Sequence, residues 1–183
     1  MSARAFLRLA LGLCAAFLLA CANPWKVLHS SGPPSALKGV TTFKVTVDYE
    51  GLMIGGKSEA EYVGGKDADT AASFAGDKKG MQEAFLATLV SNKSDFAFGD
   101  TGQVDVRINV RFIEPGFYVG VAKMPTSLIT DVTFSKDGQV LDQIEIPTAQ
   151  DPDMLHASSG GRMRDCAVIA ANDVLLFLKK ANK

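Results

Sequence analysis

Two aspartates and a histidine lie within six residues of one another in the last third of the chain. Asp151, Asp153 and His156 offer carboxylate and imidazole groups, which together can hold a divalent metal ion. The same residues suit a tight turn, because aspartate side chains accept hydrogen bonds from nearby backbone amides. We favour the turn, since a loop offers few groups to orient three ligands, and we expect no metal and no cofactor.

The stretch "SSGGR", Ser158 to Arg162, could hold a phosphate group. Free amides at a helix start, two glycines and an arginine suit an anion. The alternative is an ordinary helix cap, in which Ser158 or Ser159 accepts a hydrogen bond from the first turn. We favour the cap, because the spacing and the lysine of a nucleotide-binding loop are missing.

Nucleophilic catalysis needs a nucleophile, a base and a group that orients the base. The chain has only two histidines, His29 and His156, and no G-x-S-x-G motif. Cys166 lies in a strongly helical segment, where we expect a small buried hydrophobic residue rather than a reactive thiol. We therefore predict that the protein is not an enzyme, and an envelope enzyme is the third of our functional hypotheses.

The first twenty residues have the layout of a secretory signal. Arg4 and Arg8 precede an apolar run over residues 9–20, which has the length of a signal core and is too short to span a bilayer. The run ends in "LLAC", Leu18 to Cys21. A basic start, an apolar run, a small residue and a cysteine, in this order, resemble the bacterial lipoprotein signal, or lipobox.

The resemblance implies that Cys21 carries a diacylglycerol, that the chain is cut before it, and that its amine receives a palmitate-type acyl chain. A plain signal peptide or an uncleaved membrane anchor is the alternative. Ala22 stands where aspartate would retain such a protein at the inner membrane. The resemblance therefore predicts an outer-membrane lipoprotein that faces the periplasm.

Composition predicts one ordinary globular domain. Cleavage before Cys21 leaves 163 residues, enough for a single core. The formal net charge changes from −1 to −3, and no basic stripe suggests nucleic acid. Residues 22–36 are rich in proline, serine and glycine, so we expect residues 21–38 to be the lipid anchor and a flexible tether, followed by one α+β domain over residues 39–183.

Four segments alternate apolar and polar side chains, which is typical of strands with one buried face. They cover residues 42–49, 103–113, 126–135 and 140–146, with a weaker strand pattern at 60–63. Asp137 and Gly138 join the last two through a tight turn, because both tolerate a positive φ. A loop is expected from Pro147 to Ala157.

Two segments have helical spacing of apolar residues. They cover residues 77–92 and 160–180. The resulting order, β-α-β-β-β-α, predicts an α+β fold in which a small mixed or mostly antiparallel sheet of about four strands has two helices packed on one face.

This order of elements behind a lipobox resembles a broad group of bacterial envelope lipoproteins, such as the curli-secretion lipoprotein and the lipoprotein activators of penicillin-binding proteins. The resemblance spans roughly residues 41–180 and includes no diagnostic motif. It implies a non-catalytic role in envelope assembly, transport or regulation, with an envelope protein as the partner. A carrier of a lipid or small apolar ligand is the alternative.

Two connections are unusually apolar: "GLMIGG" at residues 51–56 and "GFYVGVAKMP" at residues 116–125. They either extend strands or fold back under the sheet, or else they form a contact patch. Because a helix connects the strands before them, those strands should be parallel and both connections should leave the same edge. We therefore predict a partner-contact edge there, built from Leu52, Met53, Ile54, Phe117, Tyr118 and Val119.

Overall fold

A computed structural model of the chain describes residues 23–119 and 121–183. Cys21 and the predicted signal segment lie outside the described residues. The main element is a mixed sheet with the strand order β1-β10-β9-β6-β2-β5, and two further short strands, β3 and β4, join it at the end of β6. Its strands are β1 (Lys26–Ser30), β2 (Thr42–Asp48), β3 (Met53–Ile54), β4 (Lys57–Ser58), β5 (Ala97–Gly99), β6 (Val104–Glu114), β9 (Thr126–Lys136) and β10 (Gln139–Gln150).

The parallel half of the sheet follows the predicted crossover. β2 pairs with β6 in parallel, and the register places Val45 opposite Val106 and Val47 opposite Ile108. The chain between them forms a helix, α3 (Ala68–Val90), as expected for a crossover between parallel strands. The short β5 continues this half as a parallel edge strand beside β2.

The antiparallel half contains the predicted hairpin between β9 and β10. Asp137 and Gly138 have φ values of 52° and 79°, so the turn prediction is confirmed. The predicted loop after Ile146 is wrong at its start, because β10 continues to Gln150. Pro147 is tolerated there, since β1 pairs with residues 142–145 only and leaves β10 as an edge strand at this point.

One predicted helix begins earlier than expected, and one further helix was not predicted. The prediction for α3 began too late, because Asp67 caps the helix by accepting a hydrogen bond from the Thr70 amide. The weak strand prediction at 60–63 is wrong, because these residues form the short helix α2 (Glu59–Gly64). Its signal was in the sequence: Ser58 and Glu61 make a reciprocal capping box, S-x-x-E.

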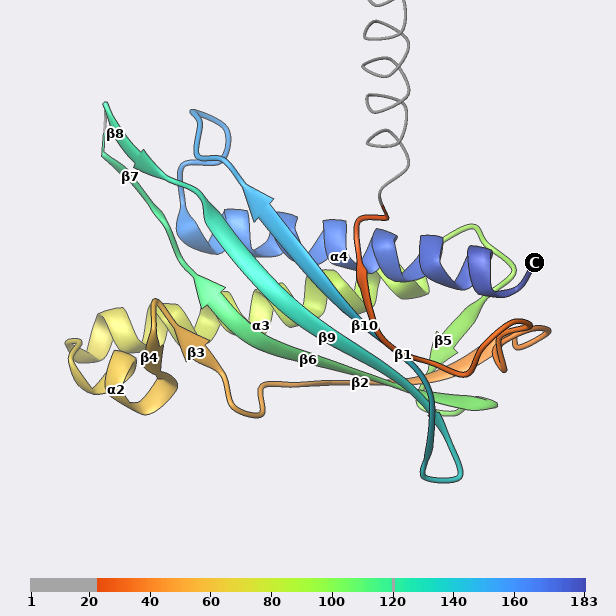
Figure 1. Cartoon of the computed structure of the whole chain (residues 1–183). Helices are drawn as coiled ribbons and strands as arrows, with labels where there is room; N and C mark the ends of the chain where they lie inside the picture. The colour runs from red at the N-terminus through yellow and green to blue at the C-terminus, as the bar shows by residue number, and fades with distance from the viewer. Residues whose placement is uncertain (1–22, 120) are drawn as a thin grey trace, which may run out of the picture.

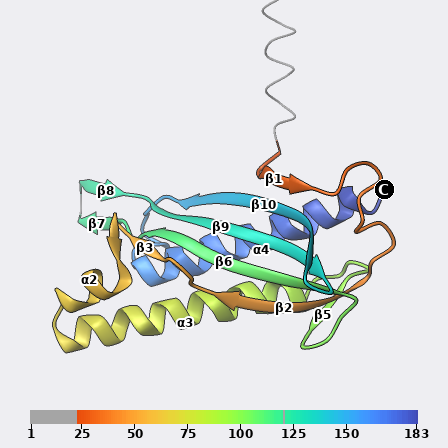
Figure 2. The same cartoon turned by 60° about the horizontal axis from the view of Figure 1, so that its bottom comes forward.

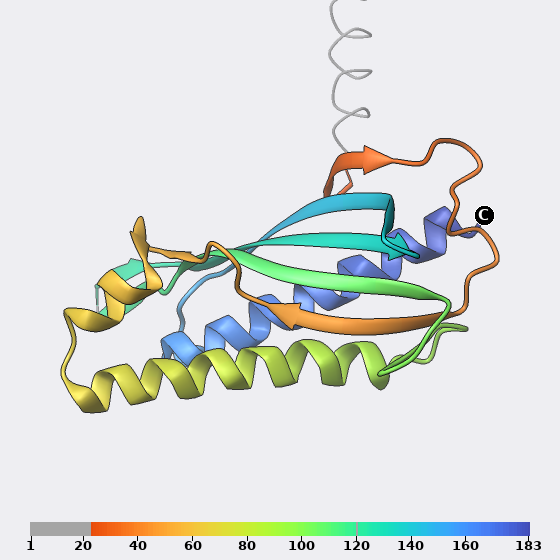
Figure 3. The ribbon, with the colours of Figure 1, turned by 90° about the horizontal axis from the view of Figure 1, so that it is seen from below.

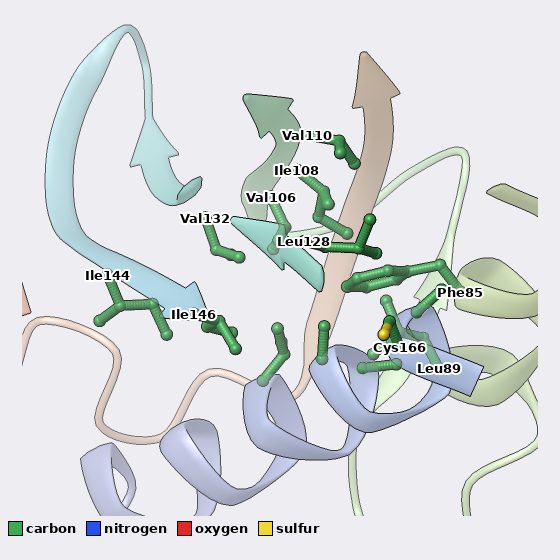
Figure 4. Close-up of a cluster of buried hydrophobic side chains, with 14 of the residues drawn as sticks. Phe85, Leu89, Val106, Ile108, Val110, Leu128, Val132, Ile144, Ile146 and Cys166 are labelled. Carbon is green, nitrogen blue, oxygen red and sulfur yellow. The ribbon is translucent and has the colours of Figure 1, made fainter. Parts of the chain in front are cut away.

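The two long helices, α3 and α4 (Ser159–Ala181), pack side by side on the same face of the sheet (Figure 3). This arrangement confirms the prediction of two helices on one face. Apolar side chains from both layers fill the space between them (Figure 4). Cys166 is one of these side chains and is fully buried, and its burial raises the pKa of the thiol to about 11. The expectation that Cys166 is a buried hydrophobic residue is confirmed.

The expected flexible tether is wrong for residues 25–36. β1 lies within this segment and pairs with β10 as an antiparallel edge strand. Trp25 is 6% exposed, and its ring meets that of Phe177 on α4 edge to face at 5.6 Å. Further along, the Ser31 amide and the Ser35 hydroxyl donate to the buried carboxylate of Asp142 at 3.0 and 2.8 Å. This polar segment is therefore ordered, because the Trp25 ring is buried and β1 pairs with β10.

The fold is α+β, as predicted, and the described residues form three helices and more strands than the predicted four. The additional strands are short or lie at edges, where alternation is too brief to be recognised. None of the helices in the described ranges is long and apolar enough to cross a membrane.

Candidate functional site

The two apolar connections lie at the same edge of the sheet. "GLMIGG" contains β3, which pairs in parallel with the end of β6 at Phe112 and Ile113. "GFYVGVAKMP" begins one residue beyond the end of β6, after Pro115, and forms a separate antiparallel hairpin of β7 (Phe117–Val119) and β8 (Ala122–Met124). Figure 1 shows this hairpin projecting beyond the sheet, at the end remote from the Asp137–Gly138 turn.

The residues of the first connection contribute mainly to the core. Leu52 is 5% exposed and Ile54 is fully buried, whereas Met53 is 39% exposed. Leu52 and Ile54 are therefore not available for partner contact, and their place in the predicted contact edge is corrected. The physical reason is that β3 extends the sheet, so Ile54 points into the core while its neighbour Met53 points outward.

The second connection places its apolar side chains in solvent. Phe117 and Tyr118 are 44% and 36% exposed, and Val119 is 70% exposed. Val121, beyond the turn, is fully exposed. We refer to these four residues as the apolar tip. Large apolar side chains that gather on one projecting hairpin are unusual in a monomeric protein and are typical of contact sites.

A buried arginine holds the base of this hairpin. Arg162, in the first turn of α4, is fully buried. Its guanidinium donates to the Thr126 hydroxyl at 2.8 Å, to the Pro115 carbonyl at 3.2 Å, and to the carbonyls of His156 and Ala157 at 3.0 and 2.7 Å. Burial lowers the pKa of this guanidinium, yet arginine stays charged in proteins. One side chain therefore joins the hairpin base, the end of the β10–α4 loop and α4.

Two glycines allow the close packing around Arg162. Gly116 has φ 62°, and a Cβ atom there would overlap the backbone carbonyl of Met124. A Cβ atom at Gly160 would overlap the carboxylate of Asp77 on α3. Only glycine avoids both overlaps, and Gly116 also needs the left-handed conformation. The base of the hairpin is therefore a tightly built junction.

Two further exposed apolar residues follow β10. Met154 and Leu155 are 90% and 91% exposed, and the loop that carries them is tied to the hairpin base through Arg162. The sequence analysis did not select them, although two large apolar residues inside a loop of aspartates and a proline were a usable signal. The connection between β10 and α4 lies at the same end of the molecule as the β7–β8 hairpin (Figure 1).

The residues considered for metal binding form a turn instead. Asp153 Oδ1 accepts hydrogen bonds from the amides of Leu155 and His156 and lies 2.8 Å from His156 Nδ1. These bonds, led by the one from the His156 amide, lower the pKa of Asp153. Asp151 does not join them, and the described residues contain no group of three or more side chains placed to hold a metal ion.

The residues considered for phosphate binding form a helix cap. Ser158 accepts a hydrogen bond from the Gly161 amide at 3.1 Å, so the preferred prediction is confirmed. Arg162 cannot reach an external anion, because it is fully buried and its donors are bonded to protein carbonyls and hydroxyls.

An open recess of about 360 Å³ lies between the hairpin and α2. Phe117, Met124 and Tyr62 contribute apolar surface to it, and Glu61 and Glu114 contribute carboxylates. Burial is the main cause that raises the pKa of Tyr62, and the negative charge of Glu114 adds to the effect. The apolar tip is thus bordered by a shallow, mixed surface on which a protein side chain could rest.

No protein-family model matches the sequence, and no curated protein matches it significantly. Among solved structures, the PelC dodecamer from Paraburkholderia phytofirmans aligns with a TM-score of 0.41 and 13% identity, over 84% of this chain and 96% of that chain. A provisionally assigned lipoprotein from Caulobacter crescentus aligns with a TM-score of 0.36 and 14% identity, over 57% of this chain and 81% of that chain. At these TM-scores the structural likeness indicates no function. The function of this chain must be inferred from its own residues and geometry.

Proposed function

We propose that this protein is a lipid-anchored lipoprotein of the cell envelope, at the outer membrane and facing the periplasm, with a non-catalytic domain that binds another envelope protein. The observation that carries the proposal is the apolar tip, which displays four large apolar side chains in solvent on a projecting hairpin. The lipobox supports the location, since it would attach acyl chains at Cys21.

The geometry of the tip favours a partner over an accidental surface. The Arg162 hydrogen bonds and the close contacts at Gly116 fix its base, so little further ordering is needed when a partner binds. Exposed aromatic side chains are also the residues that contribute most to binding energy at protein interfaces. Phe117 and Tyr118 are therefore the expected centre of the interface, with Val119 and Val121 at the end of the hairpin.

The carrier hypothesis finds less support. A carrier would hold its apolar ligand between the sheet and the helices, but buried side chains such as Phe43, Met81 and Phe134 occupy that space. A filled core beside an exposed apolar hairpin is the pattern expected of an interaction module.

Photo-crosslinking in cells tests the proposed contact. A photoreactive amino acid at Val119, which is 70% exposed, should capture one specific envelope protein. The matched control is Val140, which is 42% exposed on the hairpin at the other end of the sheet. The proposal is rejected if both positions capture the same set of proteins, or if Val119 captures none.

Substitution of the two aromatic residues tests their role. Phe117→Ser combined with Tyr118→Ser should abolish the Val119 crosslink and leave the melting temperature within about 4 °C of the parent, since each exposed substitution rarely changes stability by more than about 0.5 kcal/mol. A much larger loss of stability would show that these rings belong to the core.

Lipidation is tested separately. Cys21→Ser should release the protein from membranes, because the acyl chains provide stable anchoring. Mass spectrometry of the mature N-terminus should find an acylated Cys21. An unmodified amine at another residue would contradict the lipobox prediction.

A further inference from the structure

The start of the described chain packs onto the last turns of α4. The side-chain amide oxygen of Asn23 accepts a hydrogen bond from Lys180, and the Lys180 ammonium lies 4.9 Å from the centre of the Trp25 ring. Trp25 in turn contacts Phe177 edge to face. The position of Asn23 is therefore fixed relative to the C-terminal end of α4.

This position limits where a lipid on Cys21 could lie. Only Ala22 separates Cys21 from Asn23, and two residues of extended chain reach at most about 7 Å. The inference that follows rests on the proposed lipidation, because a lipid on Cys21 would bring the bilayer surface against this end of the domain. A flexible tether would have allowed the lipid to lie farther from the domain, but part of the segment predicted as a tether forms the strand β1.

Lysines gather at the same end from three separate parts of the chain. Lys38, Lys93, Lys179, Lys180 and Lys183 are all exposed and line two adjoining recesses there, of about 440 and 480 Å³. Asp95 is the one acidic residue among the side chains that line these two recesses. Within the described ranges, none of the five lysines pairs with a side-chain carboxylate. Lys38 donates to the Lys183 main-chain oxygen at 3.1 Å and Lys180 donates to Asn23, but neither contact neutralises a positive side-chain charge with an acidic side chain.

The outer face of α4 continues this surface with apolar side chains. Ile169 and Leu176 are 39% and 41% exposed. With Lys180 they occupy positions i, i+7 and i+11, which lie on one stripe of a helix. Asp173, at position i+4, is a partly exposed carboxylate on the same stripe. Exposed apolar residues beside lysines are typical of helices that rest on a membrane, where the lysine heads meet the headgroups and the apolar side chains enter the interface.

We infer that this anchor-proximal surface, made of Lys38, Lys93, Ile169, Leu176, Lys179, Lys180 and Lys183, lies against the bilayer and binds anionic phospholipid headgroups. The occupant is a lipid surface rather than a protein, because the proposed lipid would emerge beside it and the charges complement anionic headgroups. The apolar tip then points away from the membrane. Arg162 and Phe177 are separated by 15 residues of α4, or about 22 Å at 1.5 Å per residue, and the hairpin projects from the Arg162 end (Figure 2).

Vesicle co-sedimentation tests this inference without the lipid anchor. The mature chain with Cys21→Ser is mixed with phosphatidylcholine vesicles that contain or lack phosphatidylglycerol. It should bind only the anionic vesicles, and added salt should weaken the binding.

A triple variant tests the lysines. Each lysine near the membrane surface contributes roughly fivefold to the partition constant. The variant with Lys179→Gln, Lys180→Gln and Lys183→Gln should therefore bind at least about tenfold more weakly.

The matched control removes the same charge from the other end of the molecule. Lys57→Gln with Lys66→Gln and Lys123→Gln changes three exposed lysines near the hairpin and should leave binding within about twofold. Equal losses in both triple variants would overturn the inference, as would equal binding to both vesicles or no binding at all. The melting temperature verifies that each variant is folded; the emission of Trp25, the only tryptophan, does not serve for the Lys180 variant, because Lys180 lies against its ring.

A second pair of variants tests the apolar part of the surface. Ile169→Ser with Leu176→Ser should weaken binding to anionic vesicles several-fold while the salt dependence of binding remains. Unchanged binding would show that these two residues do not contact the membrane. These measurements use protein without acyl chains and without a protein partner. Their failure is therefore distinct from a failure of lipidation, seen by mass spectrometry, or of partner capture, seen by crosslinking.

Discussion

The two ends of this domain are held by different interactions. At the end that carries the apolar tip, the buried charge of Arg162 bonds to carbonyls from two separate segments. At the other end, the ring of Trp25 packs on Phe177, and hydrogen bonds to Asp142 order the chain that follows. Directional hydrogen bonds fix a projecting hairpin in one geometry, whereas burial of an aromatic ring needs only a matching apolar surface.

Both ends depend on α4, whose first turn holds the hairpin and whose last turns hold β1 (Figure 2). The helix thus separates a surface proposed to bind protein from a surface proposed to bind lipid. A single substitution can disrupt each end, at Arg162 or at Trp25. Changes at Cys166 in the core and at Gly138 in the β9–β10 turn are expected to have smaller effects.

The largest effect is expected from Arg162→Met. The variant retains an apolar stem but removes the Arg162 donors from the buried Thr126 hydroxyl and the partly buried His156 carbonyl, whereas the Pro115 carbonyl still accepts from the Thr126 hydroxyl. Each group that remains unsatisfied costs about 1–3 kcal/mol. We expect the free energy of unfolding to fall by about 3–5 kcal/mol, measured by urea denaturation. Arg164→Met, on the exposed side of the same helix, is the control and should change it by less than about 0.5 kcal/mol. Similar effects of the two variants would contradict the role of Arg162.

Trp25→Ala should have the next largest effect. Removal of a buried tryptophan costs about 3 kcal/mol or more in a core, and somewhat less at the edge of the sheet, so we expect a loss of about 2–3 kcal/mol. Hydrogen exchange should show that the amides of β1 lose protection while those of β7 and β8 keep it. Leu28→Ala, which removes a side chain that is 42% exposed, is the control. Unchanged protection of β1 would mean that Trp25 does not hold this segment.

The core between the two ends should respond to pH through Cys166. Its pKa is raised by burial to about 11 in the folded protein from 9.0, so the neutral thiol is favoured by folding. This contribution is fully present below pH 9 and is lost as the pH rises towards 11, by up to about 2–3 kcal/mol at 1.36 kcal/mol per pKa unit. Urea denaturation across this range, compared with Cys166→Ala, checks it. An equal pH dependence in both proteins would assign the effect to other groups, such as Tyr49.

The smallest effect is expected from Gly138→Val in the β9–β10 turn. Gly138 has φ 79° and nothing within 4 Å of an added Cβ, so backbone strain is the only cost, about 1 kcal/mol or more for a β-branched residue. The apolar tip lies at the other end of the sheet, and the Val119 crosslink should persist. The denaturation midpoint measures the change, and an unchanged midpoint would mean that the turn tolerates valine without strain.

Much of the central fold could be predicted because its signals are local. Alternation over seven or more residues identified β2, β6, β9 and most of β10, and the Asp137–Gly138 pair identified their hairpin. The start of α3 and the whole of α2 were missed although Asp67 and the Ser58–Glu61 box marked them, so these errors were avoidable. The short edge strands carry no comparable pattern.

The sequence by itself determined the periodicity of the main strands, the helix caps and the glycine turns, since these depend on side chains only a few residues apart. Tertiary structure decided the rest. β1 exists because β10 offers it an edge, and Leu52 and Ile54 are buried while Phe117 is exposed because only the first connection rejoins the sheet. The lysines of the anchor-proximal surface are spread from Lys38 to Lys183. Burial and surface charge are sums over neighbours in space, and those neighbours are set only when the chain has folded.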